Sequence, residues 1–158
     1  MRRMELSGEL VAGRFFAGVN SLQFASPSIG RELERAESFD SLHWMNAADP
    51  ASPAGLGIEG LDPRIPGRLA SNRIYFRGDK IVATAGKGGR ELRVFVEPDD
   101  PDVATLAELL KIPRTRKVFP ERKILIERIN SVDATQSAYS CIFKAGGFVP
   151  DRGRLCFW

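Results

Sequence analysis

The fold class of this chain is decided by one stretch of sequence, NRIYFRGDKIVATA, residues 72–85. Both halves of the stretch are rich in β-branched and aromatic residues. Between them, Gly78-Asp79 has the composition of a two-residue turn that joins antiparallel strands. A glycine-rich turn at 86–89 then leads into another β-forming run at 91–96. The pattern therefore predicts an antiparallel meander of three strands.

Side chains on the first strand of this meander alternate between its two faces. Ile74 and Phe76 fall on one face, which we expect to pack on the core. Arg73, Tyr75 and Arg77 fall on the other face. Two guanidinium groups beside an aromatic ring can bind phosphates while the ring stacks on a base, so this face is a candidate site for single-stranded nucleic acid. The alternative is the ordinary solvent face of an antiparallel sheet.

The segments around the meander predict three helices and a further strand. Ser26 and Asp100 each precede a proline and are typical helix caps. The helix after Ser26 is expected to end near Ser38, and a third helix is expected over 133–146. The helix after Asp100 carries an apolar stripe made of Val103, Leu106, Ala107 and Leu110. Another strand is expected at 123–129. Together these elements predict the mixed α+β class, as a single domain over residues 1–158.

A long connection is predicted over residues 47–71, which are dominated by alanine, proline, glycine and serine. Loops of this length are uncommon inside a compact domain, and they are usually functional or disordered. We therefore expect this loop-rich segment to separate the first part of the chain from the meander.

The composition is that of a soluble globular protein, with 43% hydrophobic and 27% charged residues among 158. No apolar run approaches the ~20 residues that cross a bilayer, and two cysteines are too few for a disulfide scaffold. These features predict a cytoplasmic protein without a membrane partner. Charge is uneven: residues 111–128 carry seven basic and two acidic side chains, while 97–108 carry five acidic and none basic. A nucleic-acid footprint and a solvated basic loop beside an acidic helix start both explain this asymmetry.

Residues for catalysis are sparse. The single histidine, His43, lies in an apolar stretch without a nearby nucleophile, and Asp49 precedes a proline as turn formers do. Lys87 lacks the glycine spacing of a phosphate-binding P-loop. Cys141 and Cys156 are expected to be buried structural thiols. We therefore predict no catalytic residues, no metal site and no cofactor in this chain, and no enzymatic activity of the chain by itself.

A second basic group is expected to form an exposed loop, and contact with phosphate is the alternative. Its members share the proline-interrupted segment 111–123 and are Lys111, Arg114, Arg116, Lys117, Arg122 and Lys123.

Several short motifs, in order along the chain, resemble the large helicase-related family of superfamily-2 helicases. In the first part of the chain the matching residues are Gly8-Glu9, Gly13-Arg14-Phe15, Gly18, Gln23-Phe24-Ala25 and Pro27. Further along, they are Ala47-Ala48-Asp49-Pro50, Asn72-Arg73, Gly78, Val82-Ala83, Glu127-Arg128-Ile129-Asn130 and Ala145-Gly146-Gly147-Phe148. Ala12 and Ser71 stand where the family usually has glycine, and the segment 111–123 has no counterpart.

The resemblance implies a position in a larger helicase rather than an activity. It corresponds to a β-rich domain that follows two motor domains and a winged-helix region, with ATP and magnesium bound only in the motor domains. On this basis the chain is a non-catalytic accessory domain of a DEAD/DEAH-type helicase that contacts single-stranded DNA or RNA. The predicted contact residues are Arg14, chosen by the resemblance, together with Arg73, Tyr75 and Arg77. The alternative is a structural domain that docks on the motor and winged-helix domains without touching nucleic acid.

Overall fold

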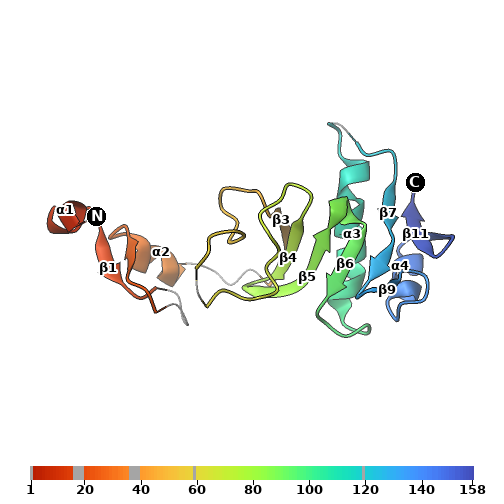
Figure 1. Ribbon diagram of the computed structural model, residues 1–158, viewed down its shortest axis with the longest axis horizontal. Helices are drawn as coiled ribbons and strands as arrows, with labels where there is room; N and C mark the ends of the chain where they lie inside the picture. Colours follow the sequence, from red (N-terminus) through yellow and green to blue (C-terminus); the bar gives the residue numbers. More distant parts are fainter. Residues whose placement is uncertain (1, 16–19, 36–39, 59, 119) are drawn as a thin grey trace. The chain divides into compact units, whose positions relative to one another are not determined.

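The computed structural model describes residues 2–15, 20–35, 40–58, 60–118 and 120–158, and it has the mixed α+β architecture that the sequence predicts (Figure 1). Most strand pairs are antiparallel; β6 and β8 run parallel. The elements are, in order, α1 Arg2–Leu6, β1 Val11–Gly13, β2 Gln23–Ala25, α2 Ile29–Arg35, β3 Leu42–Asn46, β4 Arg73–Arg77, β5 Lys80–Gly86, the 3-10 turn η1 Lys87–Gly89, β6 Glu91–Val94, α3 Pro101–Thr115, β7 Ile124–Ile126, β8 Arg128–Ile129, β9 Val132–Asp133, α4 Ser140–Ala145, β10 Val149–Asp151 and β11 Arg154–Phe157.

The chain divides into two compact units. The smaller unit comprises Met1–Phe39 and Leu56–Pro63, and the larger comprises Asp40–Gly55 and Arg64–Trp158. In the smaller unit, β1 and β2 form an antiparallel pair, and α2 follows the predicted cap at Ser26. The predicted end of that helix, near residue 38, lies outside the described residues. The single domain expected over 1–158 stays a prediction.

The predicted meander forms the centre of the larger unit. Strands β4, β5 and β6 are consecutive neighbours in a six-stranded sheet of order β3-β4-β5-β6-β8-β9. The hairpin between β4 and β5 turns at Gly78-Asp79, and Gly78 has φ of 59°, a left-handed conformation that glycine adopts without strain. The strand pairing and the turn therefore confirm the meander.

Helix α3 covers one face of this sheet, which we call the inner face. Asp100 caps the helix by accepting a hydrogen bond from the Asp102 amide through its side chain, at 2.8 Å. The stripe of Val103, Leu106, Ala107 and Leu110 is buried in the main core, as predicted. Strand residues Tyr75, Leu92 and Val94 and helix residue Phe143 of α4 lie in the same core.

Two segments of the long connection, 47–55 and 64–71, cover part of the opposite face of the sheet, which we call the outer face. The structure shows no helix or strand in the described residues between Asn46 and Arg73. Ala47 and Ala54 of this loop are fully buried against Ile74 and Ile81, and Ile65 packs on the same cluster. The loop therefore acts as the lid of a second, smaller core.

Two expectations for the C-terminal part are wrong. The strand predicted at 123–129 is two strands, β7 and β8, in different sheets. The break occurs because the amides of Glu127 and Arg128 both donate to the Arg90 carbonyl, at 2.8 and 3.2 Å, which bends the chain. The helix predicted over 133–146 starts only at Ser140, since Asp133 pairs in β9. Cys141 of this helix is exposed, so the prediction that it is buried is wrong as well, whereas Cys156 is buried in β11 as predicted.

Strand β7 instead joins β11 and β10 in a three-stranded antiparallel sheet. Its inner side carries Ile124, Ile126 and Leu155, which belong to the main core. None of the helices in the described ranges has the length and apolar character needed to traverse a bilayer.

Candidate nucleic-acid interface

The predicted face of Arg73, Tyr75 and Arg77 points inward, so the expectation of a solvent-exposed face is wrong. Tyr75 is only 1% exposed and lies in the main core under α3. This burial raises the pKa of its hydroxyl to about 12, although the neighbouring Arg73 acts in the opposite direction. The ring cannot offer a face to a base from this position. The alternation along the strand correctly predicted which side chains share a face, but other parts of the protein cover both faces of β4.

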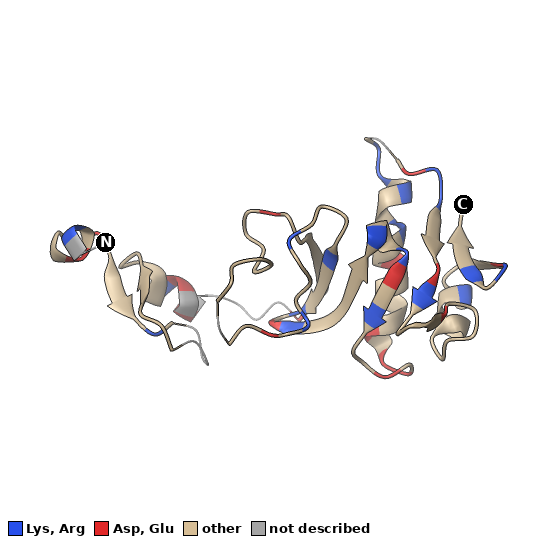
Figure 2. Cartoon of the chain, viewed as in Figure 1, with Lys and Arg blue, Asp and Glu red and all other residues tan. Residues whose placement is uncertain are grey.

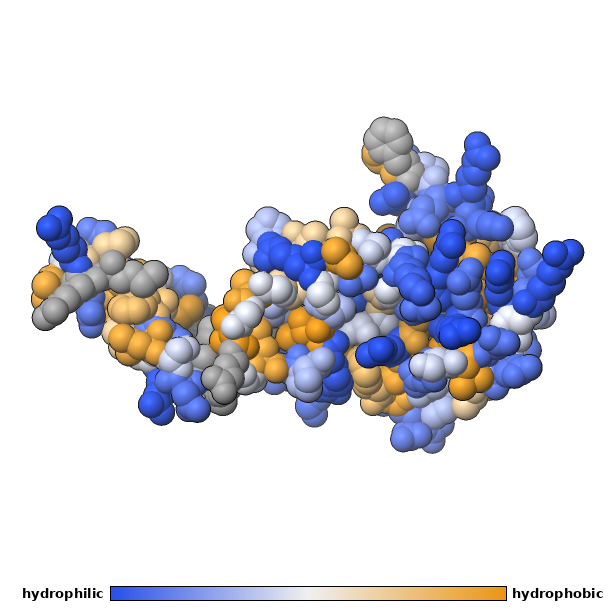
Figure 3. All heavy atoms as spheres, in the orientation of Figure 1, coloured by the Kyte–Doolittle hydropathy of each residue, from blue (hydrophilic) through white to orange (hydrophobic). Residues whose placement is uncertain are grey.

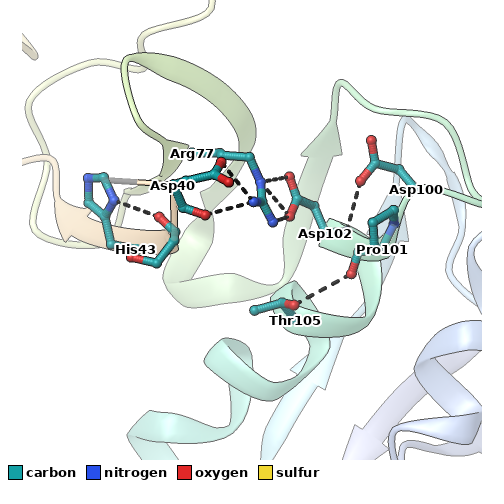
Figure 4. A network of polar contacts seen from close by, with 8 residues as sticks. Asp40, His43, Arg77, Asp100, Pro101, Asp102 and Thr105 are labelled. Atoms are coloured by element: carbon teal, nitrogen blue, oxygen red, sulfur yellow. Dashed lines mark hydrogen bonds and ion pairs between the residues drawn. The ribbon is translucent and has the colours of Figure 1, made fainter. Parts of the chain in front are cut away.

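Arg77 holds the start of α3 against β4 (Figure 4). Its Nε donates to both carboxylate oxygens of Asp102, at 2.8 and 2.7 Å, and its Nη2 bonds the same carboxylate. Its Nη1 donates to the carbonyl oxygen of Asp40 at 2.7 Å and to the Asp40 carboxylate at 3.2 Å. The hydrogen bonds that the guanidinium donates to Asp102 and Asp40 raise the pKa of Arg77. Each of its three guanidinium nitrogens is engaged within the protein.

The other two predicted contact residues, Arg73 and Arg14, lie in different units. Arg73 is 15% exposed, forms an ion pair with Glu121 at 3.6 Å, and lies over the ring of Trp44 at 5.5 Å from its centroid. Arg14 is exposed and belongs to the smaller unit. The structure thus brings Arg73, Tyr75 and Arg77 together on one inward face and leaves Arg14 in a different unit.

A different surface of the larger unit has the properties predicted for that face. Along β6, Leu92 and Val94 point into the main core, so Glu91 and Arg93 point to the outer face. On the neighbouring β8, Ile129 is buried and Arg128 is exposed on the same side. Coloured by charge, this part of the sheet carries basic and acidic segments close together (Figure 2).

We call this surface the charged sheet face, and three adjoining hollows define it. Arg93 and Arg128 border a hollow of about 210 Å³ with Glu91 and Ser131, and Arg128 also borders one of about 270 Å³. The third, of about 340 Å³, lies beside η1 and β7. Hydrophilic side chains gather over this part of the molecule in the space-filling view (Figure 3). The basic residues lining the hollows are Lys87, Arg90, Arg93, Lys123, Arg128, Arg152 and Arg154, and the acidic ones are Glu91, Glu121, Glu127 and Asp133.

The charged sheet face has a basic excess, and much of its basic charge is not neutralised within the protein. Lys87 pairs with Glu91 at 2.8 Å, which lowers the pKa of the Glu91 carboxyl, and Arg154 lies 3.9 Å from Glu127. In the part of the chain that the structure describes, no hydrogen bond or ion pair engages the side chains of four arginines, namely Arg90, Arg93, Arg128 and Arg152. These guanidinium groups are therefore available to an anion from outside.

The second basic group divides between a helix and a loop. Lys111 and Arg114 lie in the last turns of α3, so the loop expected at 111–123 begins only at Arg116. Lys111 donates to Glu108 at 2.6 Å and to the Gly146 carbonyl at 3.1 Å, which engages it within the fold. Arg116, Lys117 and Arg122 are exposed, and Lys123 borders the hollow beside η1.

The other two residues considered for catalysis, His43 and Asp49, make contacts that belong to the fold. His43 lies on β3 and stacks on Phe76, with 5.6 Å between ring centroids. Asp49 forms the predicted turn, since its side chain accepts a hydrogen bond from the Ala51 amide at 2.8 Å. Within the described ranges, no group of three or more histidine, cysteine, aspartate or glutamate side chains is arranged to hold a metal ion.

The signal for the charged sheet face was present in the sequence. In Glu91-Leu92-Arg93-Val94 the apolar and charged residues alternate strictly, as they do on a strand with one uncovered face. In 73–77 the aromatic residues fall on both faces, which is typical of a strand covered on both sides.

Comparison with known proteins adds no family to this description, because no protein-family model matches the chain and no curated protein matches it either.

Proposed function

We propose that the larger unit binds nucleic acid through the charged sheet face and acts as a non-catalytic accessory domain. The observation that carries this proposal is the set of seven basic side chains against four acidic ones around the three adjoining hollows. A polyanion with regularly spaced phosphates matches such an extended basic surface better than a small anion does, since it can occupy several sites at once.

The position of the arginines on a sheet supports phosphate contact. Arg93 and Arg128 extend from neighbouring strands whose opposite side is packed in the main core, so their backbone is fixed before a ligand arrives. A preorganised guanidinium loses less conformational freedom on binding than one on a loop. It can also donate two parallel hydrogen bonds to a phosphate.

The wider setting rests on the resemblance to the large helicase-related family. In that setting the unit is part of a cytoplasmic ATP-dependent helicase and contacts single-stranded DNA or RNA beside the motor domains, which alone bind ATP and magnesium. Arg93 and Arg128 replace Arg73, Tyr75 and Arg77 as the proposed contacts of the larger unit. Arg14 stays a proposed phosphate contact of the smaller unit.

A salt titration with matched charge variants tests the proposal. The affinity of the full chain for a fluorescent single-stranded oligonucleotide is measured at several salt concentrations for the double variant Arg93→Gln/Arg128→Gln. The control is Lys80→Gln/Lys144→Gln, which removes the same charge from two exposed residues elsewhere in the larger unit. We expect the first variant to lower the salt slope by about 0.7 per lost phosphate contact and the control to leave it unchanged. Equal slopes in the two variants, or no binding by the unmodified chain, would contradict the proposal.

A second candidate function is docking on another protein domain, and the smaller unit carries the observation that favours it. Six of its large apolar side chains are exposed in the described residues: Met4, Leu6, Val11, Leu22, Leu56 and Ile58. Exposed apolar groups of this size are common at protein–protein contacts. Association with motor or winged-helix domains that is lost in Leu6→Ser and Leu22→Ser variants, without any oligonucleotide binding, would favour this function.

A further inference from the structure

The surroundings of Trp158 bear on which form of nucleic acid the charged sheet face accepts. Strand β11 pairs with β7 so that Phe157 lies opposite Ile124. Trp158 and Lys123 are the residues next to this pair on the two chain segments, and both are exposed. The Lys123 Nζ lies 5.3 Å from the centroid of the Trp158 ring, within the range of a cation–π contact.

The indole of Trp158 is an available aromatic surface. The residue is 64% exposed, the highest value among the exposed aromatic residues of the described chain. The phenylalanine beside it, Phe157, is half-buried and packs on Phe148. Trp44, the other tryptophan, is half-buried against the main core and covered by Arg73. Among these three rings, only that of Trp158 can present a broad face to a ligand.

The hollow beside the ring has the charge needed to hold a phosphate. Lys87, Arg90 and Lys123 border it; Lys87 also pairs with Glu91, and the carboxylate on the rim of the hollow, Glu121, is already paired with Arg73. Lys123 borders the hollow and contacts the indole at the same time. A phosphate at the hollow and a base on the ring would therefore be neighbouring parts of one strand.

We infer that this corner of the charged sheet face selects single-stranded nucleic acid, with Trp158 stacking on an unpaired base while Lys87, Arg90 and Lys123 hold the adjacent phosphate. The inference rests on the proposed function, which it makes more specific. In a duplex the base faces are already stacked on each other and are closed to an indole. A single strand of DNA or RNA exposes them, and stacking on an aromatic side chain tolerates any base.

The test compares Trp158→Ala and Trp158→Phe with the unmodified full chain. The probes are oligothymidylate, oligouridylate and a blunt-ended DNA duplex. For the single strands, we expect Trp158→Ala to weaken binding by about 5- to 150-fold, which corresponds to the loss of one stacked base. The salt slope should stay unchanged because no phosphate contact is lost. Trp158→Phe should retain most of the affinity, and duplex binding should be the same in all three proteins.

Quenching of tryptophan fluorescence is a second, independent measurement. Oligothymidylate should quench the fluorescence of the unmodified chain, and the quenching should disappear in Trp158→Phe, since Trp44 is covered.

Salt-dependent binding with equal single-strand affinity in Trp158→Ala would overturn this inference and leave the proposed function standing. The same holds if Trp158→Ala weakens duplex binding equally. Absence of binding to every probe would overturn both, and circular dichroism of the variants confirms that each is folded. A difference between oligothymidylate and oligouridylate identifies DNA or RNA as the preferred strand.

Discussion

Arg77 on β4 and Arg93 on β6 are arginines of the same sheet, separated by a single strand, and they have opposite surroundings. Arg77 points to the inner face, where Asp102 and Asp40 take up its donor groups. Arg93 points to the outer face, where no loop covers it. Whether an arginine on a strand is engaged within the protein or is open to a ligand therefore depends on what packs over its face of the sheet. On β4, α3 lies over one face and the long connection over the other, whereas on β6 only the inner face is covered.

The largest effect on stability is expected at Tyr75, on the covered inner face of β4. Replacing it with alanine removes a fully buried ring from the main core, and we expect a loss of about 3–5 kcal/mol in the free energy of unfolding. Urea denaturation measures the change, and Tyr75→Phe is the matched control because it keeps the ring. A loss below about 0.5 kcal/mol in Tyr75→Ala would mean that this face of β4 is open to solvent after all.

The next effect is a loss of stability at alkaline pH. Burial raises the pKa of Tyr75 to about 12 in the folded protein, against about 10 in an unfolded chain. Between these two pH values the folded state keeps a proton on Tyr75 that the unfolded state releases. The stability of the fold is therefore unaffected by this group below pH 10, and it falls as the pH rises towards 12. We expect up to about 3 kcal/mol of difference between the unmodified chain and Tyr75→Phe across this interval. Parallel pH profiles of the two proteins would contradict the burial of the hydroxyl.

A smaller loss is expected when the partner of Arg77 is neutralised. The Asp102 side chain is 5% exposed, and its carboxylate accepts the Arg77 hydrogen bonds. Asp102→Asn keeps the size but offers one acceptor oxygen and places an amide group against a cation, so we expect a loss of about 2 kcal/mol in unfolding free energy. The matched control is Asp99→Asn, an exposed acid nearby, with a change within about 0.5 kcal/mol. Similar losses in both variants would mean that the ion pair with Arg77 does not stabilise the fold.

The smallest effect on stability is expected on the charged sheet face, and it sharpens the contrast between the strands. Arg93→Ala and Arg128→Ala remove exposed side chains that form no hydrogen bond or ion pair in the described part of the protein, so each should change the free energy of unfolding by less than about 0.5 kcal/mol. Thermal and urea denaturation measure this. A loss as large as that of Asp102→Asn would show that these arginines stabilise the fold and are not held ready for a ligand.

Local patterns were sufficient for most of the secondary structure of the larger unit. The turn at Gly78-Asp79 and the stripe from Val103 to Leu110 were both predicted from neighbouring residues. They depend on interactions within a few positions of the chain, namely a left-handed glycine in the turn and helical spacing in the stripe. One error in the C-terminal part came from a contact with a distant segment. The kink at Glu127 depends on the Arg90 carbonyl, which is far away in sequence.

The candidate site divides in the same way. The sequence by itself determined which side chains share a face, because alternation along a strand is a local property: Arg73, Tyr75 and Arg77 do lie together, and so do Glu91 and Arg93. Only the tertiary structure decided which of these faces meets solvent. The exposure of each face depends on where α3 and the loop segments 47–55 and 64–71 pack. Those segments make apolar contacts with residues far away along the chain. Hydrophobic burial has no direction of its own, so a strand with apolar groups on both sides is covered wherever another apolar surface can reach it.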